Sequence, residues 1–109
     1  VHVCAMHPLD GAAPAILHAG PGCHATLNPS QTLVLTDAFC HPTPERNAVL
    51  LYEIGAAVPR LLASYEMGDA HWASGIHAHP TWNAGGGRIY FNARDDNGLP
   101  QVYCIELDE

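Results

Sequence analysis

The sequence predicts an all-β protein built from repeated antiparallel strands. Two observations support this fold class. Short apolar runs are separated by Pro, Gly, Asn and Asp, which are typical turn residues. In addition, a pattern with a period of about 50 residues occurs twice along the chain. No stretch shows the sustained 3.6-residue periodicity of a capped helix, so helices are not expected to contribute much.

The apolar runs define the expected strands. They cover residues 1–6, 15–19, 24–28, 32–37, 48–54, 60–66, 76–82, 88–93 and 101–107. Many of them are apolar on both faces, which indicates strands that are buried on two sides. Residues 57–68 could alternatively form a short helix, but Pro59 and the β-favouring residues after it favour a strand.

The repeat gives the order of these strands. Residues 24–37 align without a gap on residues 79–92, with His, Thr and Asn at matching positions, and a polar loop and another apolar run follow each copy. With four strand types A to D, the order is C-D, A-B-C-D, A-B-C. We therefore expect one domain over residues 1–109, with repeat copies at about 24–54 and 79–107 and a C-D strand pair at 1–20. A repeat of four antiparallel strands has the size of a β-propeller blade, so about two blades are expected.

Composition excludes several classes of partner. The 109 residues include four arginines and no lysine, and the net charge is −7. Such a chain would be repelled by a phosphate backbone and by an anionic membrane surface. No apolar run is long enough to cross a bilayer, and no signal-like segment opens the chain. These features do not determine the cellular compartment. A soluble protein is expected, and the cytoplasm is favoured over other compartments.

The four cysteines, Cys4, Cys23, Cys40 and Cys104, are scattered along the chain. None forms a C-x-x-C pair, which excludes a zinc ribbon. Free, buried thiols are the expected state in an apolar domain of this size, and disulfide bridges are the alternative.

A pair of histidines stands out in the stretch "GIHAHPTW", residues 75–82. Pro80 disfavours a helical conformation for the residue before it. In an extended chain, side chains two apart point to the same side, so His77 and His79 are expected on one strand face. Imidazole nitrogens are good ligands for divalent transition metals.

Two longer stretches carry a family resemblance. Residues 79–107, "HPTWNAGGGRIYFNARDDNGLPQVYCIEL", resemble the blade repeat of TolB-like propellers. "GCHATLNPSQTLVLTD" (22–37) followed by "SGIHAHPTW" (74–82) is similar to the C-terminal part of the oligogalacturonate lyase-like seven-bladed propellers. The resemblance implies a partial β-propeller, the last two blades of such an enzyme.

The resemblance also implies a metal site. In that family, three histidines and a glutamine bind a divalent metal, usually manganese, and the matching histidines here are His24, His77 and His79. The glutamine position is Ser74, so water would have to fill that place. Alternatively, the histidine at the start of each A strand is only a feature of the repeat. Its ring nitrogens would then form hydrogen bonds with the backbone or with water and would bind no metal. His77 argues against this alternative, because the matching residue in the first copy is Gly22.

Two functions are therefore expected. The first is a propeller-like module that is structural, interacting or metal-binding and does no chemistry by itself, because the blades that carry the family's base and substrate-binding arginine are not in this chain. The alternative is a metal-dependent lyase, or a fragment of one, that cleaves uronic-acid oligosaccharides by β-elimination. Arg46 and Arg94 are the loop cations available to such an acidic sugar.

The expected oligomeric state follows from the apolar surface and the edge strands that two blades would expose. Two blades alone would leave two apolar sheet faces bare, and unpaired edge strands invite pairing with another chain. We expect those faces to carry Val34, Leu35, Leu50, Ile89 and Phe91. The sequence thus predicts a homo-oligomer, a dimer rather than a ring, joined through sheet faces or edge strands.

Overall fold

The computed structural model describes residues 3–67 and 76–107, which form strands and loops without a helix. The first sheet pairs β1 (Cys4–Met6) with β2 (Ala15–His18). The middle sheet has the order β3 (Thr26–Leu27), β4 (Leu33–Ala38), β5 (Arg46–Glu53) and β6 (Arg60–Glu66). The third sheet has the order β7 (Thr81–Trp82), β8 (Arg88–Arg94) and β9 (Pro100–Glu106).

All neighbouring strands are antiparallel. The all-β class and the order C-D, A-B-C-D, A-B-C are therefore confirmed, and residues 60–66 form a strand rather than a helix. None of the three sheets is closed. In the part of the chain that is described, no helix has the length and hydropathy required to span a bilayer.

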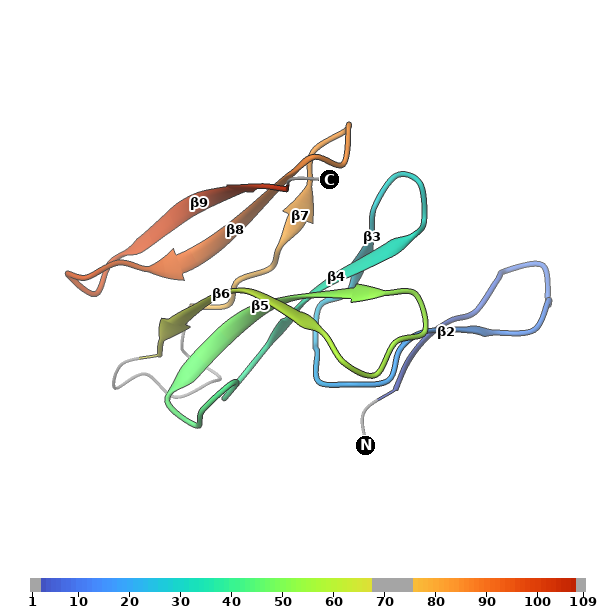
Figure 1. Ribbon diagram of the computed structural model, residues 1–109, viewed down its shortest axis with the longest axis horizontal. Helices are drawn as coiled ribbons and strands as arrows, with labels where there is room; N and C mark the ends of the chain where they lie inside the picture. Colours follow the sequence, from blue (N-terminus) through green and yellow to red (C-terminus); the bar gives the residue numbers. More distant parts are fainter. Residues whose placement is uncertain (1–2, 68–75, 108–109) are drawn as a thin grey trace.

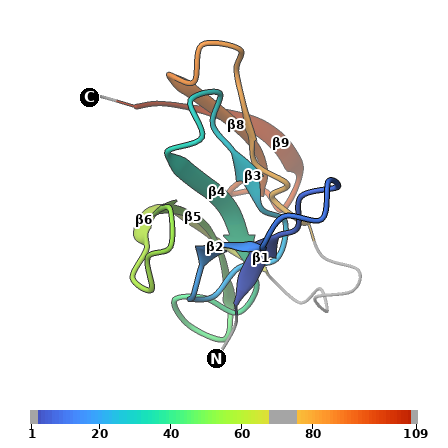
Figure 2. The same ribbon diagram turned by 90° about the vertical axis from the view of Figure 1, so that its right-hand side faces the viewer.

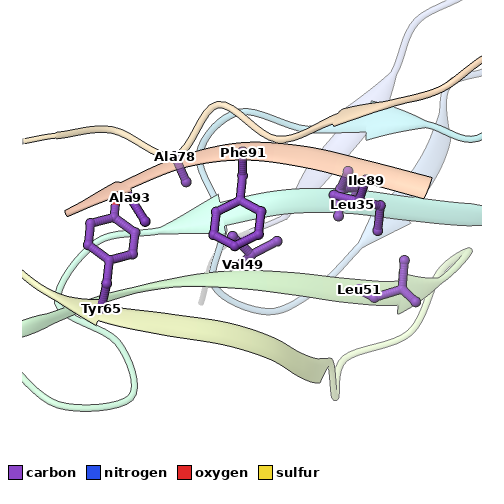
Figure 3. Packing of buried hydrophobic residues seen from close by; sticks show 8 residues of the cluster. All are labelled: Leu35, Val49, Leu51, Tyr65, Ala78, Ile89, Phe91 and Ala93. Carbon is purple, nitrogen blue, oxygen red and sulfur yellow. The ribbon is translucent and has the colours of Figure 1, made fainter. Parts of the chain in front are cut away.

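The middle sheet lies between the other two (Figures 1 and 2). One of its faces packs against the third sheet, and the shared core contains Leu35, Val49, Leu51, Tyr65, Ala78, Ile89, Phe91 and Ala93. Figure 3 shows the ring of Phe91 pointing toward Val49, and Ala93 lying beside the ring of Tyr65. Alternate residues of β8 contribute to this core, as the two-residue period of a strand requires.

The opposite face of the middle sheet packs toward the first sheet. Its buried side chains are Val34, Ala38, Ala48, Leu50 and Tyr52, and Leu17 of β2 packs against them. The Tyr52 ring stacks on His18 with centroids 4.5 Å apart. The Tyr52 hydroxyl donates to the carbonyl of Pro21 at 2.6 Å. Strands β4 and β5 are thus buried on both faces, as their apolar runs predict.

The two repeat copies share their turn chemistry. The Asn28 side chain accepts hydrogen bonds from the backbone N–H groups of Thr32 and Leu33 at 2.8 and 2.9 Å. In the second copy, Asn83 accepts from the N–H of Arg88, the position that matches Leu33, at 3.0 Å. Each asparagine therefore closes the loop between an A and a B strand, which gives the sequence repeat a structural basis.

The prediction that five apolar residues lie on exposed sheet faces is wrong. Val34, Leu35, Leu50 and Ile89 have no exposed area, and Phe91 is 7% exposed. They are covered because the middle sheet is sandwiched, so both of its faces meet a neighbour. The third sheet instead exposes Tyr90 and Val102 on its outer side. A homo-oligomer stays a prediction, and its contact would have to use that outer side or an edge strand.

The cysteines are free, but their expected burial is wrong. Cys23, Cys40 and Cys104 are exposed, and Cys4 is half-buried. The reason for Cys104 lies in the register of the third sheet: it pairs with exposed Tyr90, and both residues lie on the outer side.

Packing between the middle and third sheets can be tested at Leu35. Leu35→Ala removes a fully buried side chain from their shared core. We expect the free energy of unfolding to fall by about 2–5 kcal/mol, because the lost contacts leave a cavity. Urea denaturation followed by circular dichroism measures it. Val102→Ala on the exposed side of β9 is the control, with a change within about 0.5 kcal/mol; equal effects would contradict the packing described here.

Candidate functional site

The three predicted histidines lie at the boundary between the middle and third sheets. His24 precedes β3, and His77 and His79 precede β7. Asp37, near the end of β4, contacts His24 and His79. The ring centroids of His24 and His79 are 3.9 Å apart. His77 lies 6.1 Å from His24 and 5.8 Å from His79 by the same measure. The structure therefore brings all three imidazoles together.

The expectation of one strand face for His77 and His79 is wrong. Residues 76–80 are not in a strand, and β7 begins only at Thr81. His79 has a φ of 42°, in the left-handed region that residues other than glycine rarely adopt. Its N–H donates to Asp37 Oδ2 at 3.0 Å, and this contact with a different sheet accounts for the turn in the backbone.

Asp37 organises the site. Its carboxylate is 1% exposed and accepts from the N–H of His24 at 2.9 Å. It also contacts His24 Nδ1, with Oδ2 at 2.9 Å and Oδ1 at 3.0 Å. An ionised carboxylate can only accept hydrogen bonds, so Nδ1 must carry the proton. His24 Nε2 then has its lone pair available for a proton or a metal ion.

Two further side chains of the described residues lie beside the cluster. Cys23 Sγ lies 3.9 Å from His24 Nε2. The ring of Phe39 lies 4.8 Å from His77 and 6.2 Å from His24, so it forms an apolar wall on one side of the cluster. The side chain of Cys23 is exposed, but partial desolvation by its neighbours, and secondly the charge of Asp37, raise its pKa above the usual value. The thiol therefore stays protonated near neutral pH, which makes it a poor nucleophile despite its histidine neighbour.

Sequence reasoning missed the roles of three residues. Asp37 was expected to end a strand, Cys23 was expected to be a free, buried thiol, and Phe39 was given no role. A signal for Cys23 existed, since it directly precedes His24. A signal for Asp37 was its alignment with Asn92, because only the first copy offers a carboxylate at that position.

The other residues that the sequence suggested for the site do not lie at the histidine cluster in the described part of the structure. Ser74, at the implied glutamine position, lies outside the described residues. Arg46 and Arg94 line a separate polar hollow of about 420 Å³ together with Glu66, Asp95 and Asp96. A second cavity, of about 530 Å³, is lined by the turns at the other end of β3 and β7, including Ser30 and Gly86. The arginines are thus surrounded by acids rather than by the histidines.

Imidazole is a common ligand of divalent transition metals. Among the described residues, the potential ligand atoms that lie within 4.8 Å of one another are those of Cys23, His24 and Asp37. Three imidazoles suit zinc, copper, nickel and iron, whereas manganese prefers carboxylate and water oxygens. Asp37 would act as the partner that orients His24, a common arrangement behind metal-bound histidines. By the chemistry of these donors, the manganese implied by the family resemblance is less well suited than zinc or nickel.

Comparisons with protein families, with curated proteins and with solved structures found no match for this chain. The resemblance to the oligogalacturonate lyase-like propellers therefore stays a prediction from the sequence.

The role of Asp37 can be tested by Asp37→Asn. The amide replaces one accepting oxygen by an N–H₂ group that faces the donors of His24 and His79. We expect the free energy of unfolding to fall by about 1–3 kcal/mol, since buried donors lose their acceptor. We also expect the Nδ1-protonated form of His24 to be lost, which nitrogen NMR of the imidazole detects.

The control is Asn92→Ala, at the matching position of the second copy, where a change within about 0.5 kcal/mol is expected. Unchanged stability and an unchanged His24 tautomer in Asp37→Asn would show that the carboxylate does not hold the site together.

Proposed function

We propose that this chain is a propeller-like module that binds a divalent transition metal through His24, His77 and His79 and catalyses no reaction by itself. The observation that carries this proposal is the convergence of three imidazoles, with ring centroids 3.9–6.1 Å apart, from the loops that precede strands of two different sheets. The three rings are stacked, with interplanar angles of 24–30°, so a shared ion would be reached by rotation of these side chains.

The held position of His24 supports the proposal further. The Asp37 contact fixes one ring nitrogen, and the other, Nε2, lies 3.9 Å from Cys23 Sγ. Such pre-orientation lowers the conformational entropy that metal binding would otherwise cost. A bound ion would supply cohesion between the middle and third sheets, since its ligands come from both.

A propeller-like arrangement is supported by the repeated antiparallel units and by their face-to-face stacking. The middle sheet packs on its neighbours through both faces, as an internal blade does. Matching positions are hydrogen-bonded in the two copies, with donor and acceptor exchanged: Cys23 N–H donates to the Asp37 carbonyl at 2.7 Å, and Asn92 N–H donates to the Ala78 carbonyl at 2.9 Å.

Lyase chemistry would require groups that the described site commits to other tasks. β-Elimination needs a base that removes a proton and a cation that holds the uronate carboxylate. Asp37 is buried beneath His24 and His79. Arg88 pairs with Glu106 at 3.1 Å, and Arg46 donates to Ser64 at 2.9 Å. A module that binds metal without turnover is therefore the better-supported function.

Calorimetric titration with zinc, nickel and manganese tests the metal proposal. We expect one ion per chain, and we expect alanine at His24, His77 or His79 to weaken zinc binding on the order of tenfold or more, since each removes a ligand. His7→Ala, at an exposed histidine near β1, is the control and should bind as the unaltered protein does. No uptake at micromolar metal would defeat the proposal.

Incubation of the metal-loaded protein with oligogalacturonate tests the absence of catalysis. We expect no rise in the ultraviolet absorbance of the unsaturated product, because the arginines are placed away from the histidines. A rise that disappears in His79→Ala would contradict this part of the proposal and support the lyase alternative.

A further inference from the structure

Cys23 and His24 direct their side chains to the same place although they are neighbours in sequence. In a regular strand such neighbours point to opposite faces. Here the chain bends at both residues before β3 begins. The bend is held by Cys23 N–H, which donates to the Asp37 carbonyl at 2.7 Å and to Thr36 Oγ1 at 3.1 Å. As a result, Cys23 Sγ lies 3.9 Å from His24 Nε2.

We propose that Cys23 supplies a thiolate as the fourth ligand of the metal, so that the centre is a closed thiolate–imidazole site that prefers zinc to manganese. This inference rests on the metal binding proposed above and adds the ligand that decides which metal is bound.

The separation of the two atoms fits a shared ion. Zinc bonds of about 2.3 Å to sulfur and about 2.0–2.1 Å to nitrogen, at a tetrahedral angle, place the two ligand atoms roughly 3.6 Å apart. The observed 3.9 Å differs from this by a small side-chain rotation. Moreover, the nitrogen involved is Nε2, the one that the Asp37 contact leaves available.

Asp37 is better placed as a support than as a ligand. Potential ligand atoms of Cys23, His24 and Asp37 all lie within 4.8 Å of one another. The Asp37 carboxylate, however, already accepts from the backbone of His24 and His79 and from the His24 ring. Moving it to an ion would leave these buried donors without an acceptor, which is costly.

The repeat shows why the thiolate comes from the first copy alone. The residue that matches Cys23 is Ala78, which is 1% exposed and belongs to the core between the sheets. One loop therefore offers Cys23 and His24, and the other offers His77 and His79, whose rings would turn out of their stacked positions beside His24 to reach the same ion. Four protein donors complete a tetrahedral zinc site, the pattern of structural rather than catalytic centres. Cys23 would also take the place that the family's glutamine leaves open.

A thiolate changes the metal preference in a predictable way. Sulfur is a soft ligand that favours zinc, whereas manganese favours oxygen. As the sulfur–metal bond forms, the thiol proton passes to the buffer, so the ligand carries the charge that stabilises the cation. A site with three imidazoles and water would show a weaker preference.

Cobalt(II) is the probe for the thiolate, because sulfur-to-cobalt charge transfer gives an absorption band in the near ultraviolet. Titration of the full chain with cobalt should produce this band, and zinc should abolish it by displacement. Cys23→Ser should lose the band and bind zinc about 10–100-fold more weakly. Cys104→Ser, at an exposed thiol on the outer side of the third sheet, should retain both properties.

Alkylation of the unaltered protein gives a second readout that does not depend on the folding of a variant. Zinc should slow the modification of Cys23 by iodoacetamide, mapped by mass spectrometry, and should leave the rate at Cys104 unchanged. Metal binding without the charge-transfer band and without protection of Cys23 would overturn this inference while leaving the three-histidine site intact. Failure to bind cobalt or zinc at all would overturn both.

Discussion

The Asp37 carboxylate is the contact on which the rest of the site depends. A buried charge is costly unless hydrogen bonds compensate for its lost hydration, and Asp37 receives such bonds from both His24 and His79. One donor belongs to the loop before β3 and the other to the loop before β7. The carboxylate therefore joins two sheets by a polar contact at the edge of their apolar interface, and it holds the ring of His24 and the backbone of His79 at once.

The same boundary shows how a repeat can produce a site that occurs once. His77 matches Gly22 of the first copy. A Cβ atom at Gly22 would lie 2.8 Å from the side chain of Thr36 and 2.9 Å from that of His18, so a histidine could not occupy it. The boundary with the first sheet is thus filled by the His18–Tyr52 stack, whereas the boundary with the third sheet has room for the imidazole cluster.

Local features of the fold could be predicted from the sequence, and features set by contacts between sheets could not. The strands and their order follow from apolar runs and turn residues such as Asn28 and Asn83. The conformation of His79 was not predictable, because a carboxylate 42 residues away sets it. Leu35 and Ile89 were expected on exposed sheet faces but are buried, because burial depends on which sheets pack against each other. His77 and His79 stood out by their spacing, and the family resemblance added His24, but the carboxylate that accepts from His24 and His79 was not predicted.

The two asparagine-closed turns have a consequence for the order of folding. The Asn28 side chain bonds to residues four and five positions ahead, whereas the His79–Asp37 bond spans 42 residues. Closing a long loop costs more conformational entropy than closing a short one, and proteins with distant contacts fold more slowly. Each hairpin can therefore form early and independently, and the imidazole cluster is assembled only in the late step in which the third sheet docks.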